Sequence, residues 1–224
     1  MSYLSQRLGL TRYEADEYYA QALDAYNKGE LDNAIDNIGF AITLLPMNAE
    51  YHAVRGLFNL EDGVEKKARE NFQSALKIHA GEVLANYGMG VLAYRGKEYE
   101  DAVKYFNRAR AVDPMRAEVP YYLAMIHHRQ QENETARVYM AQALELMEAS
   151  GDKRKSDARK WVREFDKLIK QAKKGKPEDD KPLKQAELPI SGAASGIRIS
   201  RDELTAGAQG GALGAGDGEE ASES

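Results

Sequence analysis

The sequence contains no cysteine, a single tryptophan and six prolines in 224 residues. The absence of cysteine excludes disulfide bonds, thiolate nucleophiles and zinc sites with thiolate ligands, and it fits a cytoplasmic protein. No apolar run approaches the roughly twenty residues that a membrane-spanning helix requires. The first ten residues, MSYLSQRLGL, lack the apolar core of a secretory signal. We therefore expect a cytoplasmic protein with one sizeable folded unit and a tail.

A period of thirty-four residues runs from about residue 15 to residue 150. Two columns, seven positions apart, hold alanine in all four copies: Ala34 and Ala41, Ala68 and Ala75, Ala102 and Ala109, Ala136 and Ala143. A third column holds only small residues: Ala22, Gly56, Gly90 and Ala124. A bulky apolar column lies between the two alanine columns: Ile38, Phe72, Phe106 and Met140. Small contact residues let two helices approach to about 8 Å, and a strict period indicates stacked helical units.

Each copy resembles a tetratricopeptide repeat, because it has a small residue at its eighth position and alanine at its twentieth and twenty-seventh. Two copies also carry the proline that the family places at the thirty-second position, as Pro46 and Pro114. The resemblance implies an all-α fold, a solenoid of about four helix pairs with repeats near 15–48, 49–82, 83–116 and 117–150 that together form an array over 11–150. It says little about function, because the family binds many unrelated partners.

The start of the array is marked by Thr11 to Glu14, which have the form of a capping box. We expect the first helix to begin near Arg12, which leaves residues 1–10 as an N-terminal arm. Glycine ends many helices in the left-handed conformation, and Gly29 and Gly63 follow the first helix of copies one and two. Copy three places its glycine one position early, as Gly96, and copy four has Gln131 instead.

Beyond residue 150 the composition changes twice. Residues 151–176 lose the repeat spacing but keep a helical apolar stripe that includes Trp161 and Phe165, so we expect a basic helix that caps the last repeat. Residues 177–224 are acidic and rich in Gly, Ala and Ser, and we expect them to be disordered. The net charge is −6 for residues 1–149, +7 for residues 150–176 and −6 for residues 177–224. The basic residues form either a solvated face or a docking patch for an acidic partner or nucleic acid.

Catalytic and metal-binding motifs are absent from the sequence. His127 and His128 are adjacent, so on a helix they point about 100° apart and cannot hold one metal together. Gly88 and Gly90 are spaced like the start of a dinucleotide fingerprint, but they lie within an expected helix, where they indicate close packing. We therefore expect a protein that is not an enzyme and has no cofactor and no metal.

The family resemblance also implies which residues line the concave face of the superhelix. The first helix of each pair supplies them, and they form the expected partner-binding groove: Tyr19, Leu23, Tyr26, Val54, Leu57, Leu60, Leu84, Tyr87, Val91, Tyr94, Arg95, Tyr121, Tyr122, Met125, His128 and Arg129.

The ninth position of each copy is apolar, as Leu23, Leu57, Val91 and Met125, where related repeats commonly have a polar residue. We expect these four side chains to form a continuous exposed apolar strip, which is unusual unless something covers it. On that basis Leu57→Asp and Val91→Asp should abolish partner binding with little loss of stability.

The expected function is that of an adaptor or scaffold that docks a helical or extended segment of another protein in this groove. The alternative is a structural or self-associating protein, whose groove is filled by its own chain or by a second copy in a homodimer. Repeats that resemble chaperone-docking modules clamp a C-terminal carboxylate with Lys, Asn and Arg. Those places hold Tyr19, Leu23, Val54, Leu84 and Gly88 here, so no such clamp is expected. Nucleic acid is not expected as the main partner either, because only the basic segment would suit it.

Overall fold

The computed structural model describes residues 3–175, with side chains from residue 9 onward. This part of the chain is entirely α-helical and contains no strand, which confirms the expected fold class. The helices are α1 Tyr3–Asn27, α2 Leu31–Leu44, α3 Ala49–Glu61, α4 Glu65–Ile78, α5 Val83–Arg95, α6 Tyr99–Val112, α7 Glu118–Arg129, α8 Asn133–Ala149 and α9 Lys155–Lys173. The segment expected to be disordered, 177–224, lies outside the described residues.

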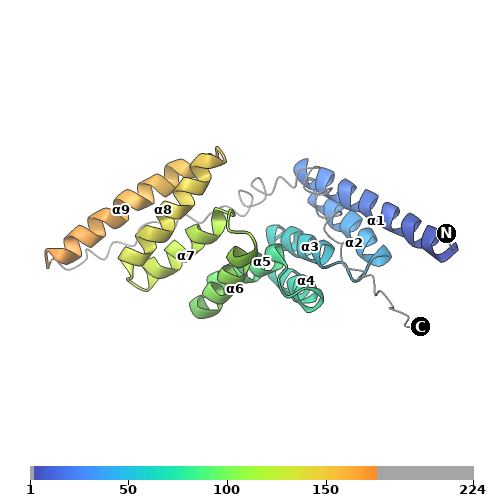
Figure 1. Ribbon diagram of the computed structural model, residues 1–224, viewed down its shortest axis with the longest axis horizontal. Coiled ribbons are helices and arrows are strands. Elements are labelled where there is room, and N and C mark those ends of the chain that lie inside the picture. Colours follow the sequence, from blue (N-terminus) through green and yellow to red (C-terminus); the bar gives the residue numbers. More distant parts are fainter. Residues whose placement is uncertain (1–2, 176–224) are drawn as a thin grey trace, which may run out of the picture.

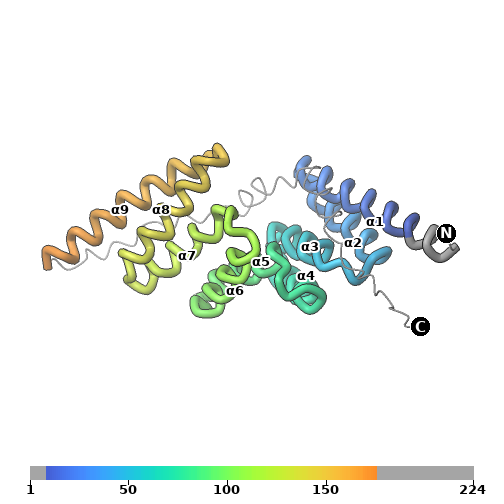
Figure 2. Tube along the Cα trace, in the orientation of Figure 1, coloured from blue at the N-terminus to red at the C-terminus, as the bar shows by residue number. Residues whose placement is uncertain are grey.

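The helices pack as consecutive antiparallel pairs, α1 with α2, α3 with α4, α5 with α6 and α7 with α8, and α9 then packs on α8. Figures 1 and 2 show these pairs following one another along an elongated body, with α1 at one end and α9 at the other. Neighbouring pairs are joined by contacts of α2 with α3, α4 with α5 and α6 with α7. The chain is therefore an α-solenoid, in which each pair contacts its neighbours.

The alanine columns lie where the helices of each pair meet, and all eight of these alanines are fully buried. The glycines of α3 and α5 allow an even closer approach. A Cβ atom added at Gly88 would lie 2.2 Å from Cζ of Phe72, and one added at Gly90 would lie 2.7 Å from Cε1 of Phe106. Since real Cβ atoms do not come so close, the interpretation of Gly88 and Gly90 as packing residues is confirmed.

The turn within each helix pair uses the same left-handed residue, thirty-four positions apart. Gly29 and Gly63 have φ angles of 79° and 77°, and Lys97 and Gln131 take the same place with φ angles of 62° each. Gly96 is not the left-handed residue of its copy, because its φ of −71° is helical. The turn geometry thus repeats along the array, although only two copies have glycine for it.

The N-terminal arm expected over residues 1–10 is wrong for residues 3–10, because α1 begins at Tyr3 and passes through Thr11 without a break. Leucine, glutamine and arginine favour helix, and no proline interrupts this stretch, so the capping sequence does not act as a start. Pro120, in contrast, is tolerated in the first turn of α7, where its missing N–H would have no helical partner.

The expected loss of repeat spacing after residue 150 is also wrong. Ala158 lies thirty-four residues after Ala124 and is fully buried, as Ala124 is. Trp161 and Phe165 belong to the same buried cluster as Met140 of α8. Helix α9 therefore stands where the first helix of a fifth pair would stand.

Two clusters of buried residues run through the array. The larger cluster extends from α1 to α7, and the smaller one joins α7, α8 and α9. Helix α7 contributes to both: Leu123 and Ile126 lie in the first cluster, whereas Tyr121 and Met125 lie in the second. Helix α7 thus connects the two parts of the core.

Candidate functional site

The sixteen expected groove residues fall into three groups by exposure. Ten are buried: Tyr19, Val54, Leu57, Leu60, Leu84, Tyr87, Val91, Tyr121, Tyr122 and Met125. Four are partly exposed, namely Leu23, Tyr26, Tyr94 and His128. Two are exposed, Arg95 and Arg129.

The exposed apolar strip expected at the ninth position is wrong. Leu57 and Val91 are each 2% exposed, Met125 is 4% exposed, and Leu23 is partly buried. For Leu57 and Val91 the reason is that α3 packs directly against α5. Leu57 and Val91 consequently lie in the larger buried cluster, and Met125 lies in the smaller one. These apolar side chains contribute to the core of the solenoid.

The accessible part of the expected groove is a rim, which we define as Leu23, Tyr26, Tyr94, Arg95, His128 and Arg129. Its residues come from α1, α5 and α7, and most lie in the last turn of the helix. Tyr26, Tyr94 and His128 share one column of the thirty-four-residue repeat, and Leu60, the α3 residue of that column, is buried. The rim combines partly exposed apolar and aromatic side chains with two arginines.

The aromatic residues of the rim pack against aromatic rings of the neighbouring first helices. Tyr26 stacks on Phe58 of α3, with 4.7 Å between ring centroids. Tyr94 contacts Tyr122 of α7 edge to face at 5.3 Å. Burial, together with the neighbouring carboxyl group of Glu61, raises the pKa of Tyr26, so this phenol stays protonated at neutral pH. The rim therefore offers ordered rings to a ligand, which lowers the entropy lost on binding.

The cations of the rim differ in their partners. Arg95 forms an ion pair with Glu65 of α4, with Nη1 and Oε1 2.9 Å apart. Within the described residues Arg129 has no carboxylate partner, so its charge is free for an incoming acidic group. Nδ1 of His128 lies 2.8 Å from Oδ1 of Asn133, and its ring lies 5.8 Å from the ring of Trp161 and 5.2 Å from that of Phe165 on α9.

Two carboxylates of the first helices, Asp16 of α1 and Glu50 of α3, are paired with tyrosines, an arrangement that sequence reasoning missed. The hydroxyl of Tyr19 donates to Glu50 at 2.7 Å, and the hydroxyl of Tyr51 donates to Asp16 at 2.7 Å. Burial and the adjacent carboxylates raise the pKa of both tyrosines. These bonds join α1 to α3. The signal in the sequence was the thirty-four-residue spacing between Asp16 and Glu50.

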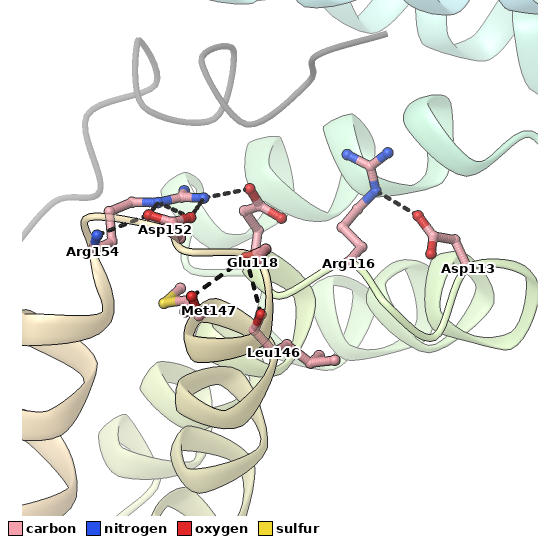
Figure 3. Close-up of polar contacts among 8 residues, drawn as sticks. Asp113, Arg116, Glu118, Leu146, Met147, Asp152 and Arg154 are labelled. Carbon is pink, nitrogen blue, oxygen red and sulfur yellow. Dashed lines mark hydrogen bonds and ion pairs between the residues drawn. The ribbon is translucent and has the colours of Figure 1, made fainter. Parts of the chain in front are cut away.

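The same column continues with Glu118 and Asp152, and Arg154 binds both carboxylates (Figure 3). Nη2 of Arg154 lies 2.7 Å from Oε1 of Glu118. Burial alone would lower the pKa of Arg154, but its hydrogen bonds to Asp152 and Glu118 raise it. Hydrogen bonds from Arg154 also hold the pKa of Asp152 below its usual value. This triad fixes the start of α9 to the start of α7.

The chemistry available at the rim is binding by contact, hydrogen bonding and charge. Burial raises the pKa values of Tyr121 and Tyr122 to about 12, so these phenols are also neutral at physiological pH.

Across residues 3–175, three or more metal-ligating side chains do not gather at any one place. Within the same residues, no helix has both the length and the apolar character to cross a membrane.

Comparison with known proteins agrees with the repeat geometry. The tetratricopeptide repeat family matches residues 19–83, 66–114 and 87–153, which together exceed half of the chain. Superkiller protein 3 of Schizosaccharomyces pombe is 35% identical over 86 residues, which is 38% of this chain and 6% of that protein. The chain therefore spans only a small part of the length of this curated relative.

Three solved structures show the same fold at low sequence identity. The structure of pilF from Pseudomonas aeruginosa has a TM-score of 0.56 at 21% identity, over 72% of this chain and 77% of that one. MamA from Desulfovibrio magneticus has a TM-score of 0.52 at 17% identity, over 70% of this chain and 96% of that one. The first repeat domain of Spaghetti (RPAP3), solved with an HSP90 peptide, has a TM-score of 0.50 at 18% identity, over 54% of this chain and 95% of that one. With its thirty-four-residue helix pairs, buried alanine columns and family match, the chain belongs to the tetratricopeptide repeat family.

Proposed function

We propose that the protein is an adaptor that binds a helical or extended segment of a partner protein along the rim. Tetratricopeptide repeat proteins mediate protein–protein interactions as adaptors or scaffolds, and their fold is an interaction module without catalytic machinery. The proposal adds to this general role a location and a type of ligand. Its location is the side of the solenoid formed by α1, α5 and α7.

The observation that carries the proposal is the exposure pattern of the rim. Leu23, Tyr26, Tyr94 and His128 are only partly covered and Arg95 and Arg129 are exposed, whereas the other ten expected groove residues are buried. Binding energy in protein interfaces concentrates in aromatic and arginine side chains that lose their remaining contact with water. A segment with apolar residues at helical or alternating spacing and an acidic residue opposite Arg129 would complement this surface.

Acidic C-terminal peptides of chaperones are not part of the proposal. The groove positions that would form a carboxylate clamp hold Tyr19, Leu23, Val54 and Leu84, none of which carries a positive charge. Three of these four side chains are also buried. A terminal carboxylate would have no cation to bind at these positions, so we expect recognition of an internal segment.

The proposal is tested by reversing the free charge of the rim. Arg129→Glu should reduce capture of cross-linked partners from the native cell extract by roughly tenfold, which corresponds to about 1.4 kcal/mol. The melting temperature should not change, because Arg129 is exposed. Arg108→Glu on α6 is the matched control, since Arg108 is an exposed arginine on the second helix of its pair. Equal capture by both variants would refute binding at the rim.

The second candidate is a structural or self-associating protein, and the partly exposed Leu23, Tyr26 and Tyr94, which a second copy could cover, support it. Light scattering coupled to size exclusion distinguishes the two. A mass of twice 24.9 kDa that returns to the single mass in Arg129→Glu would assign the rim to a homodimer.

A further inference from the structure

Helix α9 carries a row of cations on the side opposite its buried residues. Ala158, Trp161 and Phe165 face α8, and the hydrophobic contact covers this side of the helix. Arg163, Lys167, Lys170 and Lys174 follow one another at spacings of four, three and four residues, which places them on one face. All four are exposed. We call these four residues the basic face.

The acidic residues of α8 do not neutralise this face. Three ion pairs join the two helices along their edges: Arg159 with Glu148, Asp166 with Arg137, and Lys173 with Glu134. Lys167 is paired within its own helix, with Nζ 3.0 Å from Glu164.

Three cations of the basic face therefore remain unneutralised. No carboxylate of residues 9–175 lies within ion-pair distance of Arg163, Lys170 or Lys174. Like charges on one helix face repel each other, so a neighbouring anion stabilises the arrangement.

The chain itself supplies a segment of the opposite charge. Residues 176–184 hold three basic and three acidic residues and are balanced. Residues 202–224 hold six acidic residues and no basic one, and four of the six lie within 217–223. The charge surplus of the region after α9 is therefore concentrated in these last residues, some forty positions beyond the basic face.

The connection is long enough for this segment to reach every part of the basic face. Helix α9 has 19 residues, which at 1.5 Å each makes it about 28 Å long. An extended chain covers about 3.3 Å per residue, so roughly ten residues span the helix. More than forty residues separate Lys174 from Asp217. Covalent connection also gives the acidic segment a local concentration in the millimolar range.

We propose that the basic face of α9 is a binding surface for acidic protein segments, and that residues 202–224 of the same chain occupy it. The contact is electrostatic, so it weakens as salt shortens the screening length from about 10 Å at 0.1 M. An acidic partner must displace this segment before it can bind α9. The basic face shares no residue with the rim.

The cysteine-free sequence allows a direct test in the full chain. Ser222→Cys, labelled with a nitroxide, should broaden the backbone amide signals of Arg163, Lys167 and Lys170 at 0.05 M salt, lowering their intensity by roughly twofold or more. The amides of Lys66 and Lys77 on α4, which are also exposed lysines, should keep their intensity. At 0.5 M salt the broadening at α9 should disappear.

Two charge variants complete the test. Neutralising Asp217, Glu219, Glu220 and Glu223 to their amides should abolish the broadening, and so should Arg163→Glu combined with Lys170→Glu. Neutralising Glu178, Asp179 and Asp180 to their amides should leave the broadening at α9 unchanged. Absence of broadening at α9, equal broadening at α4 and α9, or broadening that survives the charge reversal would each overturn the proposal.

Occupation by another polyanion is tested with a fluorescent oligothymidylate and with vesicles of anionic lipid. The chain with neutralised residues 217–223 should bind each probe at least about fivefold more tightly than the unmodified chain at low salt. Equal affinity of the two chains would mean that the basic face is open to other anions, which contradicts the proposal.

Discussion

At the scale of single residues, the turns within the helix pairs show that the repeats are not equally well adapted. Lys97 and Gln131 adopt a left-handed conformation that Gly29 and Gly63 provide without steric cost. For residues with a side chain, this conformation costs about 1 kcal/mol. Copies three and four therefore hold a small strain that copies one and two avoid.

Replacing Lys97 by glycine should relieve this strain. We expect Lys97→Gly to raise the free energy of unfolding by up to about 1 kcal/mol, despite the larger chain entropy of glycine in the unfolded state. Urea denaturation followed by circular dichroism measures the change. Gly96→Ala is the neighbouring control, because Gly96 has a helical φ and the nearest atom to an added Cβ is Oε1 of the flexible Glu98 side chain, at 3.3 Å. A loss of stability in Lys97→Gly would show that the lysine side chain has a role of its own.

The triad of Arg154, Glu118 and Asp152 is the buried ionic contact between α9 and α7. The side chains of Arg154 and Glu118 are 15% and 9% exposed. Arg154→Met should destabilise the protein by about 3 to 5 kcal/mol, because it leaves the Glu118 carboxylate buried without a cation. Arg137→Met removes an ion pair whose partners are 45% and 42% exposed, and it should cost less than about 1 kcal/mol. Thermal unfolding of both variants checks the difference, and equal losses would show that the triad is solvated.

At the scale of the helices, α9 stabilises the last repeat through its aromatic side chains. Trp161 is 8% exposed and Phe165 is fully buried, both in the cluster with Met140 and Met147. Trp161→Ala or Phe165→Ala should each cost about 3 kcal/mol. Hydrogen exchange should accelerate first in residues 117–149. Exchange that stays equally slow there would show that α9 does not hold α7 and α8 in place.

The helix pairs could be predicted because the size of the residues at the repeated positions determines how the helices pack. Alanine at two columns and a large side chain between them leave a helix few ways to approach its neighbour, so these columns are buried as expected. The start of α1 could not be predicted in the same way. Thr11 can cap a helix or continue one, and the helix-forming residues before it decide the outcome.

The exposure of the groove residues could not be read from the sequence either. Whether Leu57 faces a ligand or the next first helix depends on how tightly α3 and α5 approach, and periodicity does not specify this distance. The tyrosine–carboxylate pairs were missed for a related reason. Tyr19 and Glu50 lie in different repeats, and only the packing of those repeats against each other brings the Tyr19 hydroxyl to 2.7 Å from Oε1 of Glu50.

At the scale of the whole molecule, burial of the ninth-position residues changes what a charge there should do. Leu57→Asp and Val91→Asp should destabilise the array by about 3 kcal/mol or more, comparable to Ala102→Asp, because each buries a carboxylate without a partner. Gln73→Asp on the exposed side of α4 is the control and should have little effect. Melting temperatures distinguish the cases. If Leu57→Asp unfolds no earlier than Gln73→Asp, the ninth-position residues are accessible after all.

The division of the core into two clusters that share α7 predicts how the molecule responds to mechanical load. When the protein is stretched between its two ends in an optical trap, the small cluster of α7, α8 and α9 should rupture first, because it has fewer buried side chains than the cluster of α1 to α7. The trace should then show two extension steps, the first of which releases α8 and α9. Phe165→Ala should lower the force of the first step and leave the second unchanged. A single step for the whole chain would mean that α7 couples the two clusters, so that they unfold together under load and not one after the other.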